Sequence, residues 1–146
     1  MAWSIEAIRE AAVAPQDVFA LYTDPTTWST WGHNVRWARS DGPLEPGGIV
    51  EVQSHYRATY RCRIRKLVRD RALELEVRPV GLFIVNVYEV EPTDRGSRVR
   101  HALEVSGAFS GPARWIGLGL LYRRLLEREV RSMIKLAAAR AQAGAA

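Results

Sequence analysis

The C-terminal third of the chain constrains the fold most, because it carries the pattern of one long amphipathic helix. Residues 110–141 repeat apolar side chains every three to four positions, the period of a helix that buries one face. The apolar stripe contains Trp115, Leu118, Gly119, Tyr122, Leu125, Leu126, Val130, Met133 and Ala137, and the opposite face contains Arg124, Glu127, Arg128, Arg131 and Lys135. Ser110 is a typical N-cap, and Pro112 suits the first turn. The sequence predicts one continuous helix that closes over the rest of the chain.

Length and composition favour one globular domain. A chain of 146 residues with 47% hydrophobic content can bury a core of its own, so we expect a single domain over residues 1–146. The one cysteine, Cys62, excludes an intramolecular disulfide framework. The N-terminus lacks the layout of a signal peptide, and no apolar run approaches the ~20 residues of a membrane span. We therefore expect a cytoplasmic protein without a transmembrane segment.

The net charge of +5 first suggests a nucleic-acid partner, but the spacing of the arginines argues against it. Arg61, Arg63 and Arg65 alternate with apolar residues, as on the solvent face of a strand, and Glu74 and Glu76 follow on the next strand. Cross-strand ion pairs account for this charge. We expect no nucleic-acid partner.

The rest of the chain alternates with period two, which is typical of half-buried antiparallel strands. The strand segments are 3–13, 35–38, 48–56, 60–68, 73–77, 82–91 and 98–105. Two short helices follow the first strand: one opens at Pro15, and the other opens at Asp24-Pro25 and carries Trp28 and Trp31.

The turn Pro92–Ser97 fixes the pairing of its two strands. If Val90 pairs with Val99, Tyr88 lies opposite His101 and Asn86 is its diagonal neighbour on the inner face. A slip of one residue would turn the outer arginines inward, so we predict this register.

Together these elements give the layout of the helix-grip fold, and several motifs agree with it. They are Ala14-Pro15 with Val18-Phe19, Thr23-Asp24-Pro25 with Trp28 and Trp31, Gly42-Pro43-Leu44 with Pro46-Gly47, Gly96-Ser97-Arg98-Val99, and Glu104 ahead of Gly107. On these residues the whole chain resembles the polyketide cyclase/dehydrase group of the START-like (SRPBCC) superfamily. The resemblance implies an α+β fold: a curved antiparallel sheet of six to seven strands, two short N-terminal helices, and a long C-terminal helix closing a cavity for an apolar or aromatic small molecule.

Several residues are candidates for lining that cavity. The expected ligand-binding residues are Tyr56, Tyr60, Asn86, Tyr88, His101, Trp115, Leu118, Gly119, Tyr122 and Leu126. The aromatic ones combine a large apolar body with a polar tip, although the same residues could instead fill a core. Gly117 and Gly119 favour a cavity, since glycine within a helix costs ~1 kcal/mol relative to alanine.

The sequence contains no nucleophile motif, P-loop, dinucleotide fingerprint or metal-ligand spacing, so we expect no metal and no cofactor. His101 and Tyr88 are the candidates for acid–base catalysis; the alternative is a core histidine hydrogen-bonded to Tyr88. His33 and His55 are expected in solvent.

Glu129 interrupts the apolar stripe, and a buried carboxylate needs a partner. Either Lys66, which simple alternation places inward, pairs with it, or Glu129 lies where the stripe reaches water.

Three functions fit these patterns. The first is binding of a hydrophobic, polyketide- or lipid-like small molecule, oriented by Asn86, Tyr88 and His101. An aromatase/cyclase could use the same three residues for aldol cyclisation and dehydration. A lipid or quinone carrier could instead contact membranes through Ile116, Leu120 and Leu121, which lie beside arginines; the same patch could form a homodimer contact.

Overall fold

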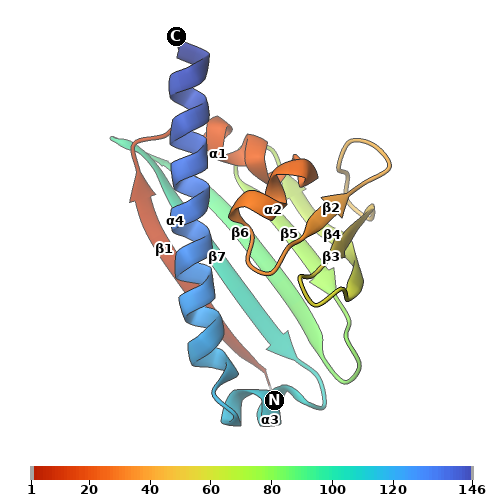
Figure 1. The fold of residues 1–146 in the computed structure, drawn as a ribbon. Helices are drawn as coiled ribbons and strands as arrows, with labels where there is room; N and C mark the ends of the chain where they lie inside the picture. The colour runs from red at the N-terminus through yellow and green to blue at the C-terminus, as the bar shows by residue number, and fades with distance from the viewer. Residues whose placement is uncertain (1, 146) are drawn as a thin grey trace.

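The computed structural model describes residues 2–145 and contains one curved antiparallel sheet of seven strands (Figure 1). The strands are β1 (Trp3–Ala11), β2 (Trp37–Arg39), β3 (Ile49–Gln53), β4 (Thr59–Val68), β5 (Ala72–Val77), β6 (Phe83–Thr93) and β7 (Gly96–Ser106). Their order across the sheet is β1-β7-β6-β5-β4-β3-β2, so β2 to β7 follow one another as hairpins. The predicted helix-grip architecture is confirmed.

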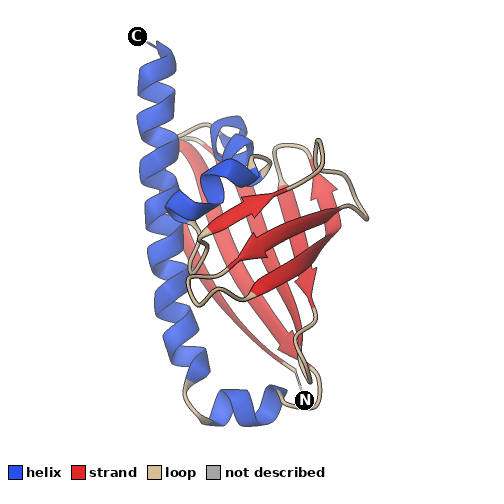
Figure 2. Cartoon of the chain, turned by 45° about the vertical axis from the view of Figure 1, so that its right-hand side comes forward, coloured by secondary structure: helices blue, strands red, loops and turns tan. Residues whose placement is uncertain are grey.

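The helices cover the concave face of the sheet unevenly. The short helices α1 (Pro15–Tyr22), η1 (Pro25–Thr27) and α2 (Trp28–Trp31) cross one end, and α4 (Leu118–Ala145) runs along the side of β1 and β7 (Figures 1 and 2). Asp24 is the predicted N-cap of η1, and its carboxylate accepts a hydrogen bond from the Thr26 backbone N–H at 3.1 Å. Within residues 2–145, no helix is both long and apolar enough to cross a bilayer.

The prediction of one continuous helix over residues 110–141 is wrong. The segment forms α3 (Ser110–Trp115) and then α4, with a turn at Ile116 and Gly117. Gly117 has a φ of +82°, a conformation that costs glycine little and other residues more. The N-cap of α3 is Phe109. Gly117 is therefore explained by a change of chain direction and gives no support for a cavity.

The predicted β6–β7 register is confirmed. Tyr88 pairs with His101, and Val90 pairs with Val99. Outside, the Arg100 guanidinium donates to Glu89 at 3.1 Å. The turn ends at Gly96, whose φ is +147°.

The predicted ion-pair ladder between β4 and β5 is also present. Arg63 lies 3.9 Å from Glu76, and Arg65 lies 3.6 Å from Glu74. Cys62 on the inner face of β4 is buried. The basic residues of β4 therefore face solvent with acidic partners beside them.

The concave face has two distinct halves. In the sealed half, beneath α1, α2 and the later turns of α4, the inner side chains are fully buried; they include Tyr22, Leu73, Val90, Val99, Leu126 and Met133. In the open half, at the α3 end of the strands, several inner side chains are only partly covered; they are Val52, Tyr60, Val77, Ile84, Asn86, Leu118 and Tyr122. The same sheet thus carries a closed core at one end and an accessible wall at the other.

Candidate functional site

A buried cluster of two histidines around one carboxylate lies at the boundary of the two halves. Glu129 of α4 is 2% exposed. Its Oε1 accepts a hydrogen bond from His101 Nδ1 at 2.7 Å, and its Oε2 accepts from His33 Nδ1 at 2.5 Å and from the His33 backbone N–H at 2.9 Å. We call His33, Glu129 and His101 the His–Glu–His cluster.

The second ring nitrogen of His101 is also occupied. Its Nε2 lies 2.9 Å from the Tyr22 hydroxyl. Burial, followed by the charge of Glu129, raises the pKa of Tyr22, so the phenol keeps its proton at neutral pH. Both ring nitrogens of His101 are therefore hydrogen-bonded, Nδ1 to the Glu129 carboxylate and Nε2 to the Tyr22 hydroxyl.

Glu129 and His33 form an ion pair at the boundary between the sealed and open halves. Burial acts to raise the pKa of Glu129, but the His33 charge and the hydrogen bonds from both imidazoles outweigh it and hold the pKa well below its ordinary value. Burial acts to lower the pKa of His33, and Glu129 reverses this and raises it above 6.5. The carboxylate and the His33 imidazolium therefore stabilise each other.

His33 is held by a short, constrained loop after α2. The Gly32 N–H donates to the Trp28 carbonyl at 2.7 Å, and a Cβ at Gly32 would lie 2.7 Å from that oxygen, so only glycine fits. Asn34 has a φ of +54° and accepts a hydrogen bond from the His55 backbone N–H through its side chain. The expectation that His33 is solvated is wrong, since its side chain is 17% exposed.

Both sequence-based expectations for Glu129 are also wrong. A register shift between Ile64 and Lys66 marks a β-bulge, which moves Lys66 to the outer face opposite Glu74. Glu129 does not reach water either, because His33 and His101 enclose it. The hydrogen-bond partners of His101 are Glu129 and Tyr22, while Tyr88 contacts the ring edge-on, with the ring centroids 4.8 Å apart.

His33 connects this cluster to the open half. Its ring packs edge-on against Tyr122 of α4, with centroids 6.0 Å apart. Burial and then the Tyr60 phenol raise the pKa of Tyr122. Within the cluster, His33 is the member that reaches the accessible surface, since the side chains of His101 and Glu129 are 0% and 1% exposed.

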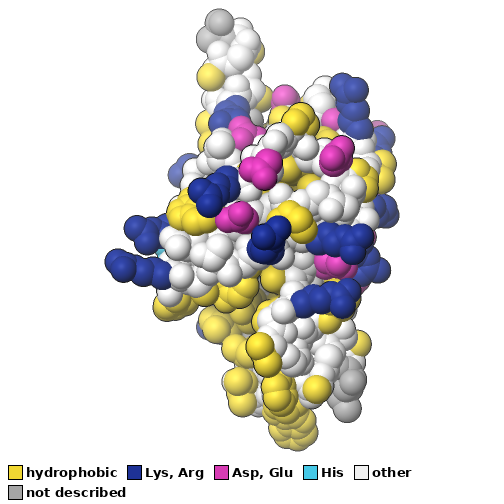
Figure 3. All heavy atoms as spheres, turned by 90° about the vertical axis from the view of Figure 1, so that its right-hand side faces the viewer, with side chains coloured by type: hydrophobic (Ala, Val, Ile, Leu, Met, Phe, Trp, Pro, Cys, Tyr) yellow, Lys and Arg dark blue, Asp and Glu magenta, His cyan; other side chains and the backbone are white. Residues whose placement is uncertain are grey.

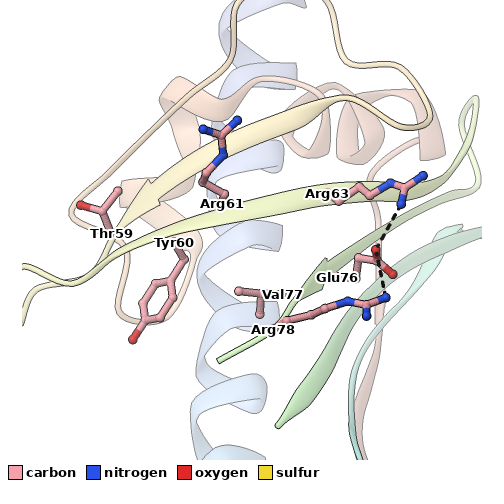
Figure 4. Close-up of a pocket in the computed structure, with 7 residues that line it drawn as sticks. All are labelled: Thr59, Tyr60, Arg61, Arg63, Glu76, Val77 and Arg78. Carbon is pink, nitrogen blue, oxygen red and sulfur yellow. Dashed lines mark ion pairs between the residues drawn. The ribbon is translucent and has the colours of Figure 1, made fainter. Parts of the chain in front are cut away.

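A pocket of about 440 Å³ lies beside Tyr60, where β4 and β5 separate. Its lining residues are Thr59, Tyr60, Arg61, Arg63, Glu76, Val77 and Arg78 (Figure 4). Figure 4 shows the Tyr60 ring and the Arg61 guanidinium on opposite sides of β4. Arg63 and Arg78 both lie 3.9 Å from Glu76. The pocket is thus at the edge of the open half rather than enclosed between β6, β7 and α4.

Nine of the ten predicted ligand-binding residues fall into three groups. Tyr60, Asn86, Leu118 and Tyr122 lie in the open half, and Tyr88, His101 and Leu126 lie in the sealed half.

Tyr56 and Trp115 form the third group, and their predicted inward orientation is wrong, because they are 87% and 90% exposed. Tyr56 lies in the β3–β4 turn, and Trp115 ends α3 at the helix break. Gly119 packs beside the Trp3 ring: a Cβ built on Gly119 would lie 3.9 Å from the nearest ring atom of Trp3.

One feature of the sequence indicated part of this cluster. A glutamate in an apolar stripe requires a buried partner, and histidine is one of the few residue types that can supply it. The spacing could not show that His33, 96 residues earlier, is that partner.

Solved structures share this fold at low sequence identity. The protein SA2116 of unknown function from Staphylococcus aureus matches with a TM-score of 0.78 and 12% identity, covering 97% of each chain. Norcoclaurine synthase from Thalictrum flavum, solved with dopamine and hydroxybenzaldehyde, matches with a TM-score of 0.71 and 14% identity, covering 95% of this chain and 88% of that one.

The di-domain aromatase/cyclase StfQ of the steffimycin pathway matches with a TM-score of 0.73 and 14% identity, covering 99% of this chain and 52% of that one. No curated protein matches the sequence significantly. The family profile described as polyketide cyclase/dehydrase and lipid transport matches residues 2–142. The chain therefore belongs to the polyketide cyclase/dehydrase and lipid transport family, within the helix-grip fold seen in the structure.

Proposed function

We propose that the protein binds an aromatic or apolar small molecule against the open half of the sheet. The observation that carries this proposal is the partial exposure of inward-facing side chains at one end of the grip. Tyr60 is 39% exposed although it belongs to the inner face of β4. Such side chains lose contact with water when a ligand covers them, and this burial stabilises a complex by about 25 cal/mol per Å² of apolar area.

The open half combines apolar and polar groups in the way that ligand sites do. Val77 and Ile84 supply aliphatic surface, while Tyr60, Tyr122 and Asn86 supply hydroxyl and amide groups that can orient a ligand. The family assignment and the aromatic molecules bound in norcoclaurine synthase support an aromatic, polyketide-like ligand. A lipid-like chain would contact the same aliphatic side chains.

Fluorescence titration with anilinonaphthalene sulfonate tests the proposal. We expect saturable binding of one probe per protein, weakened about tenfold in Tyr60→Ala by the loss of ring contact. Tyr56→Ala is the matched control, since it removes the same ring from the exposed turn three residues before β4 begins at Thr59. Equal effects of the two substitutions, or binding that never saturates, would contradict the proposal. Native mass spectrometry of freshly purified protein would identify the class of a co-purified ligand.

A second candidate function is acid–base catalysis of the cyclase/dehydrase type, with His33 as the proton donor. Glu129 holds the Nδ1 side of the ring and raises the pKa of His33, so the proton on Nε2 is available at neutral pH. In the dehydration of an aldol adduct, His33 gives this proton to the departing hydroxyl, which leaves as water. The neutral imidazole then takes the proton of the adjacent carbon as the double bond forms, and His33 ends protonated as it began.

Dehydration of an aromatic β-hydroxy ketone to its conjugated enone, followed by ultraviolet absorbance, tests this second function. We expect His33→Gln to lower the rate by about a hundredfold or more, while His55→Gln, in the exposed β3–β4 turn, leaves it unchanged. An absence of turnover by the wild-type protein would leave binding as the function. Equal rates for His33→Gln and wild type would remove His33 from the reaction.

A further inference from the structure

Six large apolar side chains are exposed together at the α3 end of the molecule. We call them the α3 patch: Val80, Phe109, Trp115, Ile116, Leu120 and Leu121. Val80 and Trp115 are 93% and 90% exposed, and Ile116 is 75% exposed. Figure 3 shows hydrophobic side chains gathered at this end. Exposed apolar side chains in one place are typical of a surface that contacts a partner or a membrane.

Backbone contacts hold the segments of the α3 patch together. The Phe109 N–H donates to the Gly81 carbonyl at 2.9 Å, and the Phe109 ring occupies the space where a Gly81 side chain would lie. The Trp3 indole N–H donates to the Ser110 carbonyl at 2.7 Å, which fixes α3 to β1. The turn at Gly117 then brings the end of α3 and the start of α4 to the same end of the protein (Figure 2).

The two segments that carry the α3 patch contain basic and no acidic residues. Residues 105–126 contain no aspartate or glutamate, and they contain the exposed arginines Arg114, Arg123 and Arg124. Arg123 contacts Glu127, 3.8 Å away and one helical turn further from the patch. The β5–β6 segment 77–83 contains no acidic residue and adds Arg78, which also lies 3.9 Å from Glu76 of β5. Exposed tryptophan and aliphatic side chains are thus bordered by guanidinium groups.

We infer that the α3 patch docks the protein onto an anionic lipid bilayer. Tryptophan and phenylalanine side chains favour the headgroup region, aliphatic side chains enter the acyl boundary, and arginines are attracted to anionic headgroups. A second copy of the chain is a poorer partner, because a two-fold contact through this patch would bring the same arginines of both chains together. Docking in this orientation places Leu118 and the open half beside the bilayer, but it does not depend on small-molecule binding there.

Co-sedimentation of the full chain with vesicles tests the inference. We expect binding to vesicles of phosphatidylcholine mixed with phosphatidylglycerol and much weaker binding to phosphatidylcholine alone. The double variant Arg123→Gln/Arg124→Gln should bind the anionic vesicles about thirty-fold more weakly. Trp115→Ala should bind about tenfold more weakly, since it removes apolar area that the bilayer would cover.

Matched controls separate docking from general charge and from folding. Arg69→Gln/Arg71→Gln removes the same charge at the β4–β5 turn, at the opposite end of the strands, and Ile8→Ala removes an exposed apolar side chain of β1. Both controls should bind vesicles as the wild type does, and thermal unfolding should show that all variants are folded.

Three results would overturn the inference. The first is that the wild-type protein does not bind anionic vesicles. The second is that the patch variants and the control variants lose vesicle binding equally. The third is that the protein sediments as a dimer, which Trp115→Ala dissociates, and does not bind vesicles. Probe titration of the open half remains a separate measurement, so failure of docking and failure of ligand binding are distinguishable.

Discussion

The sealed and open halves are built from the same strands and the same helix, yet polar side chains are enclosed in one half and partly exposed in the other. In the sealed half, Glu129 is enclosed and both its oxygens are bonded to histidines. In the open half, Tyr60 and Asn86 face inward with only partial cover. The difference arises because α1 and α2 cover one end of the sheet only (Figure 1).

This contrast shows where on the concave face a ligand would gain binding free energy. Among the described residues, every fully buried side-chain nitrogen and oxygen has a hydrogen-bond partner, so the buried polar atoms of the sealed half are already bonded within the protein. Its buried ion pair fixes α4 to the corner after α2. The open half keeps exposed apolar area, whose burial favours binding.

The largest expected effect is in the sealed half, at Glu129. Glu129→Ala leaves two buried histidines without their acceptor, and breaking a buried pair by removing one partner costs about 3–5 kcal/mol. Urea denaturation measures this loss. Glu127→Ala, two residues away and exposed, should change the free energy of unfolding by no more than about 0.5 kcal/mol. Equal costs at the two positions would show that the cluster contributes nothing to stability.

Two leucines of α4 compare the halves directly. Leu126→Ala opens a cavity at a side chain that is 1% exposed and should cost about 3 kcal/mol. Leu118→Ala, in the open half, should cost about 1 kcal/mol, because its side chain is only partly buried. The order should reverse for binding of anilinonaphthalene sulfonate, which Leu118→Ala should weaken more. If Leu126→Ala weakens probe binding more, the ligand enters the sealed half.

The smallest expected effect is the pH dependence that His33 contributes. Its pKa is raised on folding, so its stabilisation is complete below 6.5 and is lost as the pH rises through the higher folded value. The pKa of Glu129 is lowered, so its stabilisation is complete above its ordinary value of 4.5 and is lost as the pH falls.

The free energy of unfolding should therefore peak in weakly acidic solution, and His33→Gln should remove the decline on the alkaline side. Urea denaturation at a series of pH values measures this, with His55→Gln as the unchanged control. The same alkaline slope in His33→Gln and wild type would show that the ion pair does not set it.

The sequence by itself determined most of the strand and helix positions and the register of β6 against β7. Alternation with period two placed Cys62 and Ile64 inside, and the need to keep arginines in water fixed Tyr88 opposite His101. These features follow from local periodicity and from the cost of burying charge. Together with the order of the elements, the short motifs spread along the chain were enough to identify the family.

Only the tertiary structure decided which residues meet. Periodicity could not show that Gly117 breaks the helix, because glycine is compatible with both a helix and a left-handed turn. A β-bulge reversed the side of Lys66, and the pairing of Glu129 with His33 joins residues 96 positions apart. The division into a sealed and an open half depends on where α1 and α2 pack, since such long-range packing is set by the summed contacts of many side chains and leaves no local pattern in the sequence.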